Sequence, residues 1–118
     1  MGVSRPQDIN AAFAAAHDAR DLDALLALYE PDALLAPQPG ERVRGAEAIR
    51  AALAGLLALQ GRMTSTNVAC VETGVLALLE AEWELSADSV EEQGRSVEVV
   101  RRQADGSWRY VIDLPYGR

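Results

Sequence analysis

The sequence predicts an α+β fold in which helices pack against one face of a mostly antiparallel sheet. Residues 5–60 carry apolar side chains at helical spacing, whereas residues 63–114 alternate as strands do. Asp105-Gly106 is a strong hairpin signal between the last two predicted strands. Helices followed by a run of antiparallel strands favour this class, and 118 residues suit a single domain over residues 1–118.

Three helices are expected in the first half of the chain. The first starts with a capping box at Ser4, and Asp21 caps the second, which ends at Pro31. The third begins near Gly45 and ends at Gly61, a residue that suits a helix C-terminus. Each helix carries an apolar stripe that can bury itself against a sheet.

The strand signals predict a sheet with one buried face. Apolar side chains alternate through residues 75–85, and Glu80, Glu82 and Glu84 occupy the opposite face. That acidic stripe is either a solvated face or pairs with arginines on neighbouring strands. A curved sheet folded against helices can enclose an apolar cavity. The expected strands span residues 33–36, 64–72, 75–85, 95–103 and 108–114.

Composition narrows the classes of partner. The net charge of -7 disfavours binding to nucleic acid, which needs clustered basic residues. No apolar run is long enough to span a membrane. Cys70 is the single cysteine, so no intramolecular disulfide forms and a cytoplasmic location is expected. No metal, nucleotide or phosphate motif is present, so no cofactor is expected.

Several segments resemble the NTF2-like superfamily, in its SnoaL-like, DUF4440-type branch. Residues 21–33 (DLDALLALYEPDA) resemble the segment leading into the first strand of that fold. Gly40 followed by residues 44–50 (RGAEAIR) resembles the turn into its third helix. Residues 74–77 (GVLA), Trp83 and residues 99–115 (VVRRQADGSWRYVIDLP) are similar to its strand half. The resemblance implies a cystatin-like cone of three N-terminal helices on a curved, mostly antiparallel sheet.

The resemblance does not select one activity. The superfamily includes isomerases, dehydratases, cyclases and non-catalytic binding or assembly domains, and its members commonly pair through their sheets. It therefore implies a homodimer through the sheet. Ketosteroid isomerases of this fold use a base Asp, a Tyr and a protonated acid. The matching positions here are Pro37, Phe13 and about Arg95, so that mechanism is not expected.

Two residues are candidates for proton transfer. Asp113 ends the last strand, and His17 is the only histidine and lies on the apolar face of the first helix. A His17–Asp113 dyad across the cavity would be the sharpest enzymatic hypothesis. Asp113 could instead make turn hydrogen bonds before Pro115, and His17 could be a core residue. Strict alternation places Asp113 on the face opposite Tyr110.

The aromatic residues are candidates for ligand binding. They could line or floor the cavity, or simply pack in the core. The candidates are Phe13, Tyr29, Trp83, Trp108 and Tyr110.

Three functions remain open from the sequence. The chain could be a cofactor-independent isomerase, cyclase or dehydratase acting by proton transfer on a hydrophobic small molecule. It could bind such a molecule without chemistry, or it could be a dimeric interaction module. Two titratable side chains converging in the cavity would favour the first function.

Overall fold

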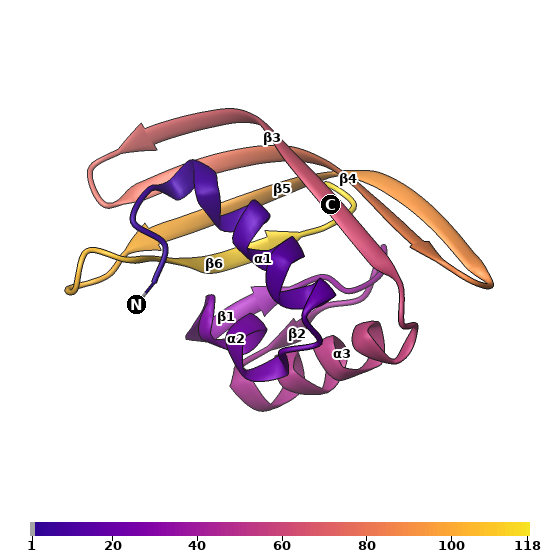
Figure 1. The fold of residues 1–118 in the computed structure, drawn as a ribbon. Coiled ribbons are helices and arrows are strands. Elements are labelled where there is room, and N and C mark those ends of the chain that lie inside the picture. The colour runs from indigo at the N-terminus through magenta and orange to yellow at the C-terminus, as the bar shows by residue number, and fades with distance from the viewer. Residues whose placement is uncertain (1) are drawn as a thin grey trace.

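The computed structural model describes residues 2–118, which form three α-helices and a six-stranded sheet (Figure 1). A single turn of 3₁₀-helix, Pro6–Asp8, leads into the first α-helix. The helices are α1 (Ile9–Asp18), α2 (Leu22–Ala27) and α3 (Ala46–Ala58). The strands are β1 (Tyr29–Leu35), β2 (Val43–Arg44), β3 (Arg62–Thr73), β4 (Leu76–Ala87), β5 (Val90–Arg102) and β6 (Trp108–Leu114).

The sheet has the strand order β2-β1-β6-β5-β4-β3. Only the β1–β6 pair is parallel, and every other neighbouring pair is antiparallel. β3, β4 and β5 arch over the helices, so the sheet has a concave inner face and an outer face (Figure 1). The predicted α+β class, with three helices on a curved and mostly antiparallel sheet, is confirmed.

The hydrophobic core lies between the helices and the inner face. Ile9 of α1, Leu25 of α2 and Ile49 of α3 are fully buried, because each lies on the apolar stripe of its helix. Leu79 and Val100 of the sheet meet them from the other side. This packing holds α1 and α3 against the sheet without filling all of the space between them.

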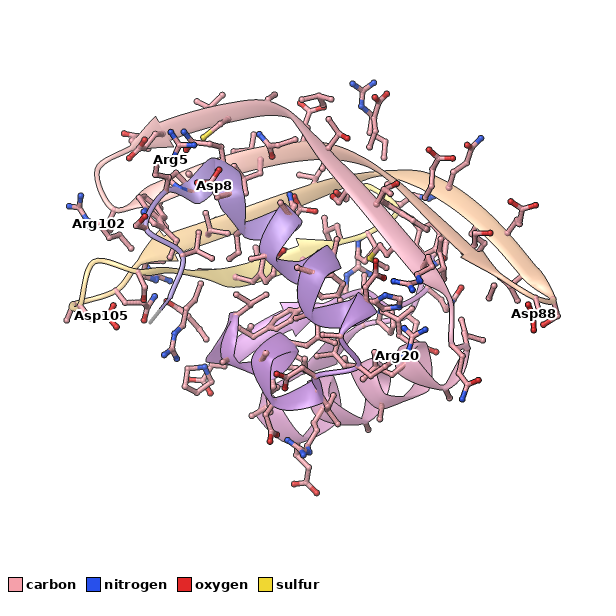
Figure 2. The ribbon with its side chains drawn as sticks, in the orientation of Figure 1. Arg5, Asp8, Arg20, Asp88, Arg102 and Asp105 are labelled. Atoms are coloured by element: carbon pink, nitrogen blue, oxygen red, sulfur yellow. The ribbon has the colours of Figure 1, made fainter. Side chains whose placement is uncertain are left out.

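Two hydrogen bonds from one arginine fix the end of α1. The Arg20 guanidinium donates to the carbonyl oxygens of His17 at 3.1 Å and Gly61 at 2.7 Å. Figure 2 shows Arg20 at the end of α1, near the loop that leads into β3.

Asp88 marks the tip of the β4–β5 hairpin, which projects beyond the helices (Figure 2). The strands expected over residues 75–85 and 95–103 are therefore joined by a shorter turn than predicted, since β4 extends to Ala87 and β5 begins at Val90.

The second helix is shorter than the pattern predicted. It ends at Ala27, and Tyr29 opens strand β1 instead of closing the helix. Pairing with Tyr110 of β6 decides this, since sheet hydrogen bonds override a local helical pattern. The expected cap at Ser4 is also wrong, because α1 is preceded by the 3₁₀ turn and lacks a side-chain cap.

A β-bulge in β6 reverses the expected orientation of Asp113. Val99 pairs with Ile112 and Val100 pairs with Tyr110, so Val111 is an extra residue with no partner of its own. An extra residue shifts the alternation of the side chains that follow it. Asp113 therefore shares the inner face with Tyr110, and the prediction from strict alternation is wrong.

Candidate functional site

A cavity of about 720 Å³ lies between the inner face of the sheet, α1 and α3. This volume falls within the range of roughly 300–1,000 Å³ that is typical of small-molecule sites. The wall formed by α3 consists largely of small side chains, among them Ala48, Ala52 and Gly55. Small residues on a core-facing helix leave space that larger ones would fill. The sequence of α3 is thus one physical cause of the cavity.

Two carboxyl groups lie side by side at the floor of the cavity. Glu98 of β5 and Asp113 of β6 are register partners on adjacent strands, and both line the cavity. Glu98 is 2% exposed and Asp113 is 6% exposed. Buried carboxylates are rare in protein cores because removing a charge from water is costly. Their placement here marks the floor as a candidate site.

Hydrogen bonds from three elements hold the pair in place. The Tyr29 hydroxyl of β1 donates to Asp113 Oδ2 at 2.5 Å. The Asn10 side-chain amide of α1 donates to Glu98 Oε1 at 2.8 Å. The Tyr110 hydroxyl donates to Asn10 Oδ1 at 2.7 Å, which orients the amide toward Glu98. The network therefore fixes both carboxyl groups on rigid elements of the fold.

The environment pushes the pKa values of the two carboxyl groups upward by different amounts. Burial, and then the nearby Asp113 carboxylate, raise the pKa of Glu98 to about 8. Burial raises the pKa of Asp113 to about 6, and the hydrogen bond from Tyr29 opposes that rise. Burial and the neighbouring carboxylates raise the pKa of Tyr29 and Tyr110, so both phenols stay protonated.

The two carboxyl groups consequently titrate as a unit. At neutral pH the pair holds one proton and one negative charge, and the hydrogen bond that Tyr29 donates favours the charge on Asp113. An acid and a base thus lie next to each other at the floor of an apolar cavity. This is the arrangement that proton transfer without a cofactor requires.

The cavity mouth is framed by aromatic rings. Trp83 Nε1 donates to the Pro115 carbonyl oxygen at 2.6 Å, and its ring meets the Tyr116 ring edge-on at 5.5 Å. The Tyr116 hydroxyl donates to Glu92 Oε2 at 2.5 Å. A glycine at position 94 is required here, because a Cβ atom there would approach the Trp83 ring to 2.7 Å. These contacts fix the C-terminal segment beside the cavity.

The structure brings five of the seven predicted site residues together. Those that line the cavity are Phe13, Tyr29, Trp83, Tyr110 and Asp113. Trp108 does not line it. This residue is buried, and it forms a bridge with Val3 near the N-terminus.

The expected His17–Asp113 dyad is not formed. His17 is fully buried outside the cavity lining, and its Nδ1 atom lies 3.0 Å from Asp18 Oδ1. The backbone amide of Met63 also donates to Asp18, so this cluster ties α1 to β3. Asp113 instead bonds to Tyr29. Helical spacing placed His17 on a buried face correctly but could not show which part of the core that face meets.

Sequence reasoning missed Glu98 and Asn10. The count along the penultimate strand pointed to Arg95, three residues before the buried acid, and Arg95 is exposed. Two signals were available. Glu98 interrupts the apolar run of residues 97–100, and Asn10 is a polar residue beside Ile9 on a buried helix face. Polar residues at buried positions need partners, and these two are partners of each other.

Within residues 2–118, no group of three or more His, Cys, Asp or Glu side chains is arranged to hold a metal ion. None of the helices described is both long and apolar enough to cross a bilayer.

Solved structures share this fold. A protein from Thiobacillus denitrificans named for the association domain of calcium/calmodulin-dependent protein kinase type II superposes with a TM-score of 0.81 at 21% identity, covering 100% of this chain and 98% of that chain. An NTF2-like protein of unknown function from Shewanella oneidensis gives 0.78 at 19% identity, with 90% and 91% covered. A Nostoc punctiforme protein of unknown function with a cystatin-like fold gives 0.76 at 18% identity, with 96% and 92% covered.

Sequence comparison adds the family. No curated protein sequence matches the chain significantly. The profile of the SnoaL-like domain matches residues 10–111, a span that includes Asn10, Glu98 and most of β6. With the fold that it shares with NTF2-like and cystatin-like structures, the chain belongs to the SnoaL-like domain family, within the NTF2-like superfamily.

Proposed function

We propose that this protein binds a hydrophobic small molecule in the cavity and catalyses proton transfer on it without a cofactor. The reaction class is isomerisation, cyclisation or dehydration. The observation that carries the proposal is the buried pair of Glu98 and Asp113 on adjacent strands, with pKa values displaced upward to different levels. A pair of titratable groups with separated pKa values assigns the acid and the base.

The roles follow from the protonation states at neutral pH. Asp113, ionised and hydrogen-bonded to Tyr29, accepts a proton from carbon. Glu98, protonated, returns a proton to another position of the same molecule. The ligand gains and loses one proton, and the carboxyl pair holds one proton before and after the cycle. Transfer of that proton from Asp113 to Glu98 resets the site.

Stability alone does not account for such a pair. Two adjacent carboxyl groups repel each other when both are ionised, and burial disfavours each charge. Apolar residues of similar volume commonly serve a core as well or better than buried charges. Perturbed titratable groups in a cavity are a recurrent feature of functional sites. The cavity size and its apolar walls support a hydrophobic ligand.

The test begins with the ligand and then measures the chemistry. Native mass spectrometry of the purified protein, followed by extraction, identifies the bound molecule. Its carbon-bound hydrogens are then followed by NMR in D₂O with wild-type protein and with the Glu98→Gln and Asp113→Asn variants. We expect each variant to slow hydrogen–deuterium exchange by about 100-fold or more, the usual contribution of a positioned acid or base.

Glu82→Gln is the matched control, because Glu82 is an exposed glutamate on β4 outside the cavity lining. It should leave the exchange rate unchanged. A double variant that carries both Glu98→Gln and Asp113→Asn gives the strictest test. If it exchanges hydrogen as fast as the wild type, the proposal that this pair transfers the proton is wrong. The protein is then a ligand-binding domain without this chemistry.

The outer face of the sheet favours a second property, pairing with another copy of the chain. Val71 and Leu78 are register neighbours and remain 62% and 42% exposed, although both are apolar. We propose that a second copy covers this face and gives a homodimer. One solved structure of the same fold is named an association domain, which supports assembly through this fold. Sedimentation velocity tests it: a monomer at micromolar concentration would exclude the dimer.

A further inference from the structure

We propose that the ligand of this cavity is an apolar organic cation, an amine or imine protonated on nitrogen, whose charged nitrogen lies against Glu98 and Asp113. This inference rests on the proposed function and names the substrate class for the same site. Three independent features of the cavity support it: the sign of its charges, the direction of its hydrogen bonds and its aromatic side chains.

Every charged side chain that lines the cavity is acidic. Glu98 and Asp113 lie at the floor, and Glu41 and Glu92 are the other two. Among the described residues of the lining there is no Lys, Arg or His. An anionic ligand would meet like charge in a largely apolar space, where repulsion is poorly screened. A cationic ligand would meet opposite charge.

The hydrogen bonds of the floor leave acceptors rather than donors for a ligand. The Tyr29 hydroxyl proton is engaged by Asp113, and the Tyr110 hydroxyl proton is engaged by Asn10. Asn10 in turn donates to Glu98. Apart from the Glu98 proton, the Ser96 hydroxyl and the second N–H of Asn10, the polar atoms left at the floor are oxygen lone pairs. A protonated nitrogen supplies N–H donors and no acceptor, which matches this set.

Aromatic faces add to the preference for a cation. Phe13 and Tyr110 meet edge-on at 6.3 Å, and both rings line the cavity beside the carboxyl pair. A cation within about 6 Å of a ring centroid is attracted by the negative face of the ring. A neutral ketone or an alcohol gains little from such a contact.

A cationic ligand also completes the chemistry. Removing a proton from carbon leaves an electron pair, and both tyrosine hydroxyls that could stabilise an oxyanion are already engaged. In a protonated imine the pair from the C–H bond forms a new C=C bond, and the π pair of the C=N⁺ bond moves onto nitrogen and neutralises it, giving an enamine. Asp113 takes the proton from the carbon next to C=N⁺. Where the ligand has a second C=C bond conjugated with the enamine, Glu98 returns a proton to the far end of that conjugated system, and the nitrogen lone pair re-forms the C=N⁺ bond and restores the cation.

Binding of three probes that share one skeleton tests the inference on the intact protein. The probes are 4-phenylbutan-2-amine, which is cationic, 4-phenylbutan-2-one, which is neutral, and 3-phenylpropanoate, which is anionic. Isothermal titration calorimetry at pH 7 measures each dissociation constant. We expect the amine to bind about tenfold more tightly than the ketone, and the propanoate about tenfold more weakly than the ketone.

Neutral variants locate the effect. Asp113→Asn keeps the shape of the side chain but removes the negative charge of the pair, so it should weaken amine binding by about tenfold while ketone binding changes by less than about threefold. Glu98→Gln replaces a protonated acid by a neutral amide and should change both constants by less than about threefold. Retained ketone binding also shows that the cavity is intact in the variant. Glu82→Gln removes the same charge outside the cavity and should leave all three constants unchanged.

The outcomes separate this inference from the proposed function. If the ketone binds as tightly as the amine, or the propanoate binds best, the inference of a cationic ligand is wrong. The proposal that the cavity binds a hydrophobic molecule is then unaffected. If no probe binds even at millimolar concentration, the pocket function itself fails, and this inference fails with it. An equal loss for amine and ketone in Asp113→Asn also overturns the role of the carboxyl pair.

Discussion

The two faces of the sheet contrast in a way that inverts the usual arrangement of side chains. The inner face, which is covered by helices, buries the carboxyl groups of Glu98 and Asp113. The outer face exposes the apolar side chains of Val71, Leu76 and Leu78. Buried charge and exposed apolar surface are each costly for a monomer in water. A ligand on the inner face and a second copy of the chain on the outer face, as proposed above, would each offset one of these costs.

The largest expected effect compares two adjacent leucines of β4. Leu79 is fully buried on the inner face, and Leu78 is 42% exposed on the outer face. Leu79→Ala should lower the free energy of unfolding by about 2–5 kcal/mol, since it leaves a hole in the core. Leu78→Ala should cost roughly 0.5 kcal/mol or less in a monomer. Urea denaturation measures both, and equal costs would erase the difference between the faces.

A charge on the outer face should break the proposed dimer. Leu78→Glu places a carboxylate in the apolar patch and should raise the dimer dissociation constant by about 100-fold or more, because the charge would lose its water on assembly. Sedimentation equilibrium measures the constant. Glu47→Gln is the control, because Glu47 is exposed on helix α3, away from the outer face of the sheet, and it should leave the constant unchanged. A dimer that tolerates Leu78→Glu must use another surface.

The inner face should make stability fall as pH rises. In the folded state the pKa of Glu98 is raised to about 8 and that of Asp113 to about 6. The folded protein therefore holds protons that the unfolded chain releases. Their contribution to stability is complete below about pH 4 and is lost as pH rises toward 8, at up to roughly 1.4 kcal/mol per pH unit for one group.

The measurement is the free energy of unfolding at several pH values between 5 and 8 for wild type, Glu98→Gln and Glu82→Gln. Glu98→Gln should flatten the curve in this window, and Glu82→Gln should not. Below about pH 4, Asp18 and Asp105 act in the opposite direction. Their pKa values are lowered. For Asp18, burial acts upward but is outweighed by hydrogen bonds from His17 and Met63, and for Asp105 the cause is hydrogen bonds from Ser107. If the free energy of unfolding falls with pH equally steeply in Glu98→Gln and in the wild type, the raised pKa of Glu98 is contradicted.

The smallest effect concerns the hydroxyl of Tyr29. Tyr29→Phe removes the hydrogen bond to Asp113 and should cost about 1 kcal/mol of stability. Because that bond opposes the upward shift, its loss should raise the pKa of Asp113 further. NMR titration of the Asp113 carboxyl carbon measures the change. An unchanged pKa would show that Tyr29 only packs against Tyr110.

Local pattern predicted the fold class because burial repeats along each element. The stripe on α3 and the alternation in β4 each specify a buried side without knowledge of the partner. The resemblance of residues 21–33 and 99–115 to NTF2-like proteins was confirmed by the family match and the solved structures. The predicted end of the second helix at Pro31 is wrong, because Tyr29 pairs with β6, and that pairing joins residues far apart in the chain.

The site was predicted only in part, for similar reasons. Phe13, Tyr29, Trp83, Tyr110 and Asp113 all line the cavity, although their roles stay predictions. The sequence allows a His17–Asp113 pair, because nothing in it shows how far a helix face lies from a strand end. Glu98 was overlooked because a count along one strand cannot identify the residue that a neighbouring strand will bring opposite Asp113.

The sequence by itself determined an α+β domain of the SnoaL-like family with an apolar cavity and few polar groups near it, since these depend on composition, period and order along the chain. Only the tertiary structure decided which acids meet. The bulge at Val111 turns Asp113 inward, and the β5–β6 register places Glu98 beside it. The physical reason is that strand alternation is lost at a single extra residue, and that residue is defined only by the partner strand.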